Sequence, residues 1–177
     1  MRTPRSADLL EEIEVPSLIM GGWYDLYAVD TFDNFTGLRE RGGTAAARDS
    51  KLIVGPWPHA LSTSTRTGDI DFGAGSKLDL DSIELEWFDR WLKNDGSGAD
   101  AAPIRLFVMG VNRWRDEQEW PLARTDWQSW NLGSGGGANT ARGDGRLSTE
   151  PLGGGPVSSD RADRFTYDPE FPVQTLG

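Results

Sequence analysis

The chain has 177 residues, no cysteine and a formal net charge of -10. A net acidic chain disfavours nucleic-acid binding, which needs Lys and Arg clustered against phosphates, and the absence of cysteine excludes disulfides and thiolate metal sites. No apolar run approaches the roughly 18 residues of a membrane-spanning helix, so we expect no nucleic acid, membrane, metal or cofactor among its partners.

The N-terminal segment, residues 1–16, does not resemble an export signal. Its basic start runs directly into Glu11, Glu12 and Glu14, where a signal peptide would carry an apolar core. This pattern favours a cytoplasmic over a secreted protein, although a chain taken from a longer protein would leave its localisation open.

Residues 15–20 form the first short apolar run, which is too short for a helix and is typical of a buried parallel strand. Two glycines end the run and allow a sharp exit. Over residues 26–41 the apolar side chains recur at helical spacing, and the helix predicted there ends at Gly42–Gly43.

A second strand is predicted over residues 51–54, where another apolar run is ended by Gly55–Pro56. A long polar loop follows. Residues 81–94 then predict a helix with Ile83, Trp87, Phe88, Trp91 and Leu92 on one face and Asp81 or Ser82 as its cap.

Alternating strands and helices over residues 1–100 predict an α/β domain with a parallel sheet. Two strands cannot bury both faces of such a sheet, so this region is expected to be the last part of a larger domain. Residues 101–177 show short strand patterns separated by Gly and Pro, which predict an all-β second domain of the sandwich or jelly-roll type, itself incomplete.

Asp25 and His59 are the candidate catalytic residues. Each follows one of the two predicted strands, and the carboxyl ends of neighbouring parallel strands share one edge of the sheet. A carboxylate there can accept the histidine Nδ1–H and make the imidazole a general base. The alternatives are a helix cap for Asp25 and an ordinary loop position for His59, with Asp69 and Asp71 as rival acids.

The order acid then histidine matches the α/β-hydrolase order of nucleophile, acid and histidine. A Gly-x-Ser-x-Gly elbow should precede the acid in that plan, and it does not occur in this chain. The expectation is therefore that the nucleophile lies upstream, in a part of the protein that this chain lacks.

Four motifs in order carry a family resemblance: VPSLIMGGWYD, LIVGPWPH, EWFDRWLK and IRLFVMGVNRWRDEQEWP. They are similar to the cocaine-esterase and X-prolyl dipeptidyl-peptidase family of serine hydrolases, from about residue 14 to residue 177. The resemblance implies the C-terminal part of an α/β-hydrolase core followed by the start of a jelly-roll domain. It also implies that Asp25 is the triad acid and His59 the triad base.

The predicted function is hydrolysis of an ester or peptide substrate by the parent protein. This chain is expected to be inactive alone, and its expected partner is the missing N-terminal part of the catalytic domain. Trp23, Tyr24 and Trp57 flank the two candidates and are the proposed substrate-binding residues. The alternative function is a non-catalytic β-sandwich binding or assembly module. The oligomeric state stays open.

Overall fold

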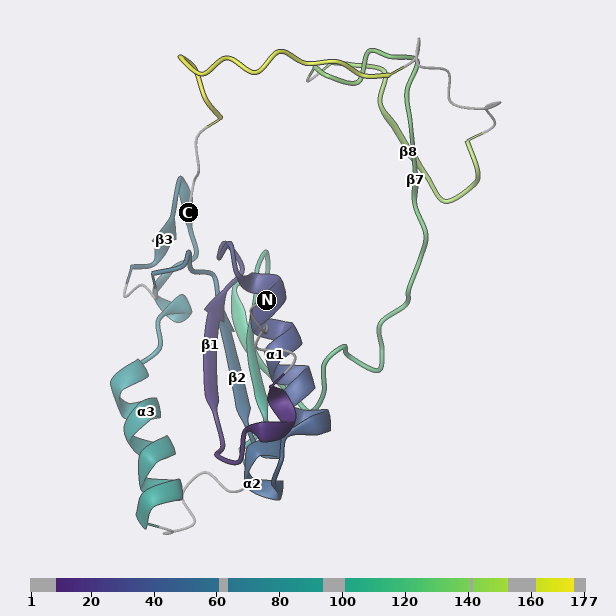
Figure 1. The fold of residues 1–177 in the computed structure, drawn as a ribbon. Helices are drawn as coiled ribbons and strands as arrows, with labels where there is room; N and C mark the ends of the chain where they lie inside the picture. Colours follow the sequence, from purple (N-terminus) through teal and green to yellow (C-terminus); the bar gives the residue numbers. More distant parts are fainter. Residues whose placement is uncertain (1–8, 61–63, 94–100, 141, 153–161, 174–177) are drawn as a thin grey trace. The chain divides into compact units, whose positions relative to one another are not determined.

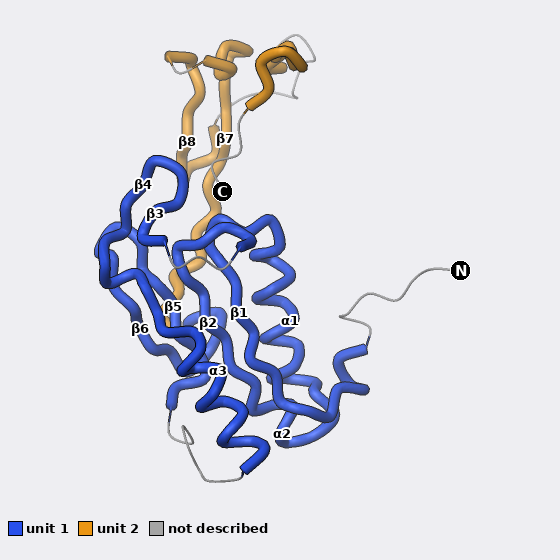
Figure 2. The backbone as a smooth tube through the Cα atoms, turned by 90° about the vertical axis from the view of Figure 1, so that its left-hand side faces the viewer, with its two compact units in different colours: residues 1–123, 176–177 blue, residues 124–175 orange. Residues whose placement is uncertain are grey.

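The computed structural model describes residues 9–60, 64–93, 101–140, 142–152 and 162–173. The chain forms two compact units, one built on residues 1–123 and the other on residues 124–175 (Figure 2). Among the described residues, no helix is long and apolar enough to cross a membrane.

The first unit is built on a four-stranded sheet in the order β1-β2-β5-β6 (Figure 1). Its strands are β1 (Leu18–Gly22), β2 (Lys51–Gly55), β5 (Ile104–Val108) and β6 (Arg113–Glu117). The first three strands run parallel to one another, and β6 pairs antiparallel with β5. This arrangement confirms the predicted α/β character of the region.

Helix α1 (Ala28–Arg41) covers one face of this sheet. Its Phe35 packs into a cluster of strand side chains that are at most 2% exposed, namely Leu52, Val54, Ile104 and Leu106. Two short helices flank α1 in the sequence: η2 (Leu10–Glu12) precedes β1, and α2 (Ala45–Arg48) lies between α1 and β2. Burial of these branched side chains stabilises the unit and fixes the register of β2 and β5.

Helix α3 (Leu80–Phe88) lies on the opposite face of the sheet and continues into a π-helical turn, η4 (Asp89–Lys93) (Figure 1). Asp79 caps it by accepting a hydrogen bond from the Ser82 amide at 3.2 Å, so the predicted cap at Asp81 or Ser82 is wrong by a few residues. Of the predicted apolar face only Trp87 is buried, whereas Phe88 and Leu92 are 55% and 79% exposed.

The loop between β2 and α3 contains the hairpin β3 (Arg66–Thr67) and β4 (Ile70–Asp71) and the short helix η3 (Ala74–Ser76). Buried Phe72 of this loop meets Phe107 of β5 edge-on, at 5.8 Å between ring centroids. The loop, predicted only as polar and long, is therefore anchored to the sheet by an aromatic contact.

Strand β5 differs from the sequence expectation. Residues 104–108 were expected to open the β-sandwich, yet β5 pairs with β2 in the α/β sheet, and the two compact units divide after Ala123 rather than at residue 100. The physical reason is burial: Ile104, Leu106 and Phe107 are almost fully covered on both faces of the strand, as in the interior of a parallel sheet.

The second unit has little regular structure. Strands β7 (Asn131–Gly133) and β8 (Arg146–Ser148) form an antiparallel pair, and no strand occurs among the described residues 162–173. None of the described residues from 124 to 173 is buried. The described part of this unit thus contains a β-hairpin but not a jelly roll.

Candidate active site

The site forms where the pairing of β1 and β2 continues past the ends of the strands. The Trp23 amide donates to the Gly55 carbonyl at 2.9 Å, and the Tyr24 amide donates to the Trp57 carbonyl at 3.0 Å. These two hydrogen bonds keep the segments side by side after both strands have ended. The next residue on one segment is Asp25, and His59 follows two residues later on the other.

Two glycines allow this close approach. A Cβ on Gly22 would lie 1.9 Å from the carbonyl oxygen of Trp57, and a Cβ on Gly55 would lie 2.4 Å from the Trp57 ring. Both distances are far below a van der Waals contact. The glycines that the sequence marks as strand ends therefore also make room for the segment that carries the histidine.

His59 and Asp25 are brought together in one hydrogen-bonded pair. The His59 Nδ1 lies 3.1 Å from Asp25 Oδ1 and 3.2 Å from Oδ2. The Asp25 side chain is only 7% exposed, while the His59 side chain is 65% exposed. The carboxylate is thus shielded and fixed, and the imidazole presents its other edge outward.

Tyr27 supports this pair, and sequence reasoning missed it. Its amide donates to Asp25 Oδ1 at 2.8 Å, and its ring meets the His59 ring edge-on with centroids 5.1 Å apart. An aspartate that accepts the amide two residues on is a common local motif before a helix. That spacing was the available signal, and Tyr27, not Asp25, is the N-cap of α1.

Such a pair can perform acid–base chemistry. A carboxylate that accepts Nδ1–H holds the imidazole in the tautomer whose Nε2 is an unprotonated acceptor. The neutral ring can then take a proton at Nε2 from a hydroxyl, and the carboxylate stabilises the resulting imidazolium. A pair with this geometry can therefore serve as a general base of fixed orientation.

The three aromatic residues predicted to bind substrate have different environments. Trp57 is 1% exposed and packs against Trp114, with ring centroids 5.6 Å apart, which places it in the core. Trp23 is partly buried, and its indole N–H donates to the Phe107 carbonyl at 2.7 Å. Tyr24 is also partly buried and contacts the ring of Phe72.

The rival acids lie elsewhere. Asp71 accepts hydrogen bonds from the Gly73 amide at 2.9 Å and from Arg66 at 3.2 Å. The Gly73 amide, followed by a hydrogen bond from the Thr65 side chain, lowers the pKa of Asp71. Asp69 is exposed, and its carbonyl accepts from Arg66. Both acids thus belong to the β3–β4 hairpin, and Asp25 is the acid beside His59.

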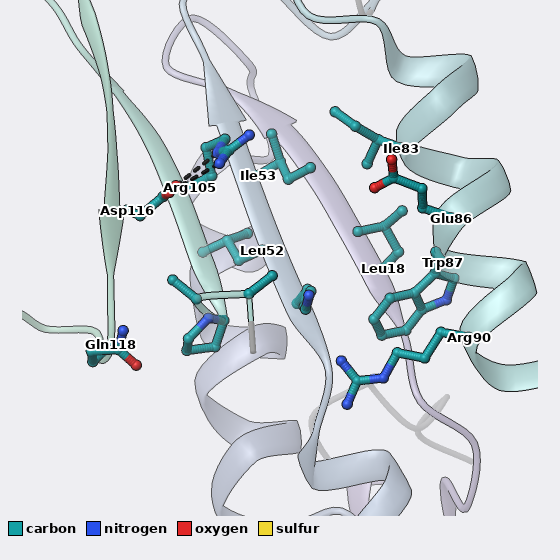
Figure 3. A pocket seen from close by; sticks show the side chains of 14 residues that line it. Leu18, Leu52, Ile53, Ile83, Glu86, Trp87, Arg90, Arg105, Asp116 and Gln118 are labelled. Atoms are coloured by element: carbon teal, nitrogen blue, oxygen red, sulfur yellow. Dashed lines mark hydrogen bonds and ion pairs between the residues drawn. The ribbon is translucent and has the colours of Figure 1, made fainter. Parts of the chain in front are cut away.

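A cavity of about 440 Å³ lies under α3 (Figure 3). Its lining includes Leu18 and Lys51, the first residues of β1 and β2, so it lies at the opposite end of these strands from Asp25 and His59. Arg105 and Asp116 form a bidentate ion pair in its wall, at 2.7 and 2.9 Å. Burial, then the nearby Arg90 charge, lowers the pKa of Lys51 at the same cavity. Across the described residues, no cluster of three or more His, Asp or Glu side chains could hold a metal.

Fold and site together define an α/β protein with a histidine–carboxylate pair at the carboxyl edge of a parallel sheet. The model of the X-Pro dipeptidyl-peptidase (S15) family matches residues 2–61, the segment that contains both residues. The chain is 36% identical over 169 residues to the cocaine esterase of Rhodococcus sp. (strain MB1 Bresler), a match that covers 93% of this chain and 27% of that protein. The chain belongs to the X-Pro dipeptidyl-peptidase and cocaine esterase family, which confirms the resemblance read from its motifs.

A solved structure shares the fold. The crystal structure of an aminopeptidase from a marine sediment Thaumarchaeota archaeon matches with a TM-score of 0.56 at 18% identity, over 81% of this chain and 22% of that one. At this identity the likeness concerns the fold alone. The chain spans about a quarter of the length of both proteins.

Proposed function

We propose that this chain carries the acid and the base of a serine hydrolase that cleaves ester or amide bonds, with Asp25 as the acid and His59 as the base. The observation that carries the proposal is the hydrogen bond of 3.1 Å between His59 Nδ1 and a shielded carboxylate. Relatives of the family are hydrolases by name, an esterase and a dipeptidyl-peptidase. Family and geometry thus support the same chemistry.

In the proposed reaction a serine Oγ attacks the carbonyl carbon of the substrate while His59 Nε2 takes the serine proton. The imidazolium, held by Asp25, then gives that proton to the departing alcohol or amine, which leaves an acyl-enzyme. Water hydrolyses the acyl-enzyme by the same proton transfers. Because the chain spans only 27% of the curated esterase, we place the nucleophile in a segment that this chain does not contain.

The experiment requires that nucleophile. A hybrid protein would be made in which the N-terminal part of the Rhodococcus esterase, up to the start of the matching region, is fused to the N-terminus of this chain. Its turnover of an activated ester would then be measured. We expect His59→Ala to lower kcat at least about 10³-fold and Asp25→Asn to lower it by a factor on the order of 10⁴. Asp69→Asn, which removes a rival acid of the hairpin, serves as the matched control and should leave kcat unchanged.

Unchanged turnover in the His59→Ala hybrid would remove His59 from the mechanism. Equal losses in the Asp25→Asn and Asp69→Asn hybrids would mean that Asp25 has no special role. Esters and prolyl dipeptides would be compared on the same hybrid, because the choice between an ester and a peptide substrate is not fixed by the two residues.

One observation favours the alternative of a β-sandwich binding or assembly module. In the second unit large apolar side chains are exposed, among them Trp127 at 78%, Phe165 at 84% and Phe171 at 81%. Surfaces of this kind usually become buried against another partner. Capture of a defined glycan or protein by the chain alone, lost on Trp127→Ala, would support this function independently of catalysis.

A further inference from the structure

The two faces of the sheet in the first unit differ in polarity. The residues of β2 and β5 that pack with Phe35 under α1 are all apolar. Because side chains alternate between the two faces of a strand, the opposite face carries Lys51 and Ile53 of β2 and Arg105 of β5, and these residues line the cavity under α3. A parallel strand paired on both sides is normally apolar on both faces. Lys51 of β2, which lies between β1 and β5, is therefore an exception that the packing of the sheet does not explain.

The cavity has an apolar wall. Leu18 and Ile53 line it from the strands, and Ile83 and Trp87 line it from α3 (Figure 3). Its volume of about 440 Å³ lies within the range of about 300–1,000 Å³ that is typical of small-molecule sites. Solvent reaches the cavity, because its wall includes the exposed residue Glu86. A small organic molecule can therefore enter and bury an apolar group there.

The charged residues of the cavity are mostly cationic, in a chain whose net charge is -10. The lining contains three cations and two acids, namely Lys51, Arg90, Arg105, Glu86 and Asp116. Arg105 pairs with Asp116, and Arg90 pairs with Asp49, which lies outside the lining. The cavity thus joins an apolar wall to a group of cations.

Lys51 is the cation whose surroundings favour an anion. Burial, and then the Arg90 charge, lowers the pKa of its ammonium group. Asp49 raises this pKa less than Arg90 lowers it, and Glu86 has the smallest effect of the neighbouring charges. The ammonium group therefore loses solvation and is repelled by guanidinium groups. A carboxylate beside it would offset both effects.

We propose that the cavity under α3 binds a small monocarboxylate with an apolar body. The carboxylate lies beside Lys51 and Arg90, and the body lies between Leu18 of β1 and Trp87 of α3. Trp87 and Arg90 are three residues apart, so one side of the helix contacts both parts of the ligand. The site is distinct from the histidine–carboxylate pair at the other end of the strands, and the proposal does not depend on the proposed function.

The charges in the wall favour a single negative charge on the ligand. Glu86 and Asp116 line the same cavity and would repel a second charge, which disfavours a phosphate or a dicarboxylate. A neutral ligand would leave the buried ammonium group of Lys51 without the added anion, and a cationic ligand would be repelled by it. The chemistry of the wall therefore selects a monocarboxylate.

Three probes that share one body test the proposal: 3-phenylpropionate, 3-phenylpropionamide and 3-phenylpropylammonium. They differ in the charge of the head group. Each would be titrated into the full chain at low salt, while methyl NMR follows Leu18 and Ile83. We expect saturable shifts with 3-phenylpropionate and nuclear Overhauser effects between its ring and both residues. The amide should bind at least about 10-fold more weakly, since it forms no charge-assisted hydrogen bond, and the ammonium should bind more weakly still.

Substitution at Lys51 separates the charge from the shape of the cavity. Lys51→Met removes the charge and keeps an unbranched side chain, so the Kd for 3-phenylpropionate should rise at least about 10-fold while the Kd for the amide hardly changes. Lys51→Arg keeps the charge and should keep most of the affinity. The matched control is Lys77→Met, because Lys77 is an exposed lysine outside the cavity and its loss changes the net charge equally.

Ile83→Trp tests the volume of the site. The larger side chain should fill the cavity without changing its charges, and it should abolish binding of both the acid and the amide. Urea unfolding would establish that each variant is folded. If Ile83→Trp does not fold, the Lys51 variants and the nuclear Overhauser effects still decide the outcome.

Several results would overturn the proposal. Equal affinities for the acid and the amide, equal affinities of wild type and Lys51→Met for the acid, or no saturable shift at any soluble concentration would each do so. So would loss of the shifts in His59→Ala, which would assign the probe to the candidate active site. Every measurement here is of binding, so a hybrid without turnover would contradict the proposed function and leave this site unaffected.

Discussion

The carbonyl oxygen of Trp57 lies 1.9 Å from the point that a Cβ on Gly22 would occupy. A side chain of any size at residue 22 would therefore push the segment after β2 away from β1. That segment carries His59, whose distance from Asp25 is 3.1 Å. Backbone contact between two strand ends thus controls the geometry of the proposed acid–base pair.

Gly22→Ala should destabilise the chain and separate the pair. The added methyl group must displace backbone rather than a flexible side chain, and overpacking of this kind costs about 1–3 kcal/mol. Urea unfolding would measure the loss. The matched control is Gly75→Ala, where an added Cβ meets nothing within 4 Å, and the free energy of unfolding should change by less than about 0.5 kcal/mol. Equal effects of the two substitutions would contradict the steric account.

Trp23→Phe should destabilise the first unit through a lost hydrogen bond. The indole N–H of Trp23 donates to the Phe107 carbonyl at 2.7 Å and so ties the end of β1 to β5. Phenylalanine keeps the aromatic packing and removes the donor, for an expected loss of about 1–2 kcal/mol. The same measurement on Trp127→Phe, where the indole is 78% exposed, should show almost no change.

The tautomer of His59 can be observed in the chain alone, because the chain has a single histidine. With ¹⁵N-labelled histidine, the neutral ring should show a protonated Nδ1 and an unprotonated Nε2, since Asp25 accepts at Nδ1. Asp25→Asn should raise the population with Nε2 protonated, and Asp69→Asn should not. A wild-type ring that is protonated mainly at Nε2 would contradict the geometry.

The loop that follows β7, residues 134–140, should open at low pH. Asp163 accepts from the Ser134 hydroxyl and the Ala138 amide, both at 2.6 Å, and these two hydrogen bonds lower its pKa. A carboxyl group whose pKa is lower in the folded than in the unfolded chain contributes its full stabilisation at pH values above its ordinary pKa. This stabilisation is lost as the pH falls through the lowered pKa. Protection of the Ala138 amide from hydrogen exchange, relative to the same amide in an unstructured peptide at the same pH, should therefore fall on acidification. In Asp163→Asn this protection should be low at every pH, and a pH-independent wild-type protection would refute the account.

Local sequence signals predicted the elements that position the site. Short apolar runs ended by glycines predicted β1 and β2, and helical spacing predicted α1 to within two residues of its start. Because both strands were expected to be parallel neighbours, the sequence also predicted that Asp25 and His59 meet at one edge. The structure shows that contact, and its catalytic role stays a prediction.

Long-range contacts decided what the sequence left open. The membership of β5 in the α/β sheet depends on its pairing with β2, about fifty residues earlier, and strand partners separated in sequence leave no local pattern. The burial of Trp57 and the exposure of Phe88 are also long-range properties. They depend on which side chains are covered by the sheet and the loops.

By itself, then, the sequence indicated the presence of β1 and β2, the family and the two residues of the pair, because short apolar runs, glycines and motif order are local properties. Only the tertiary structure decided the spacing of that pair, the supporting contacts of Tyr27 and the place of β1 at the edge of the sheet among the described strands. These depend on how closely two backbones approach and on which hydrogen-bonding groups remain at the edge of the sheet, and both are set by packing across the sheet.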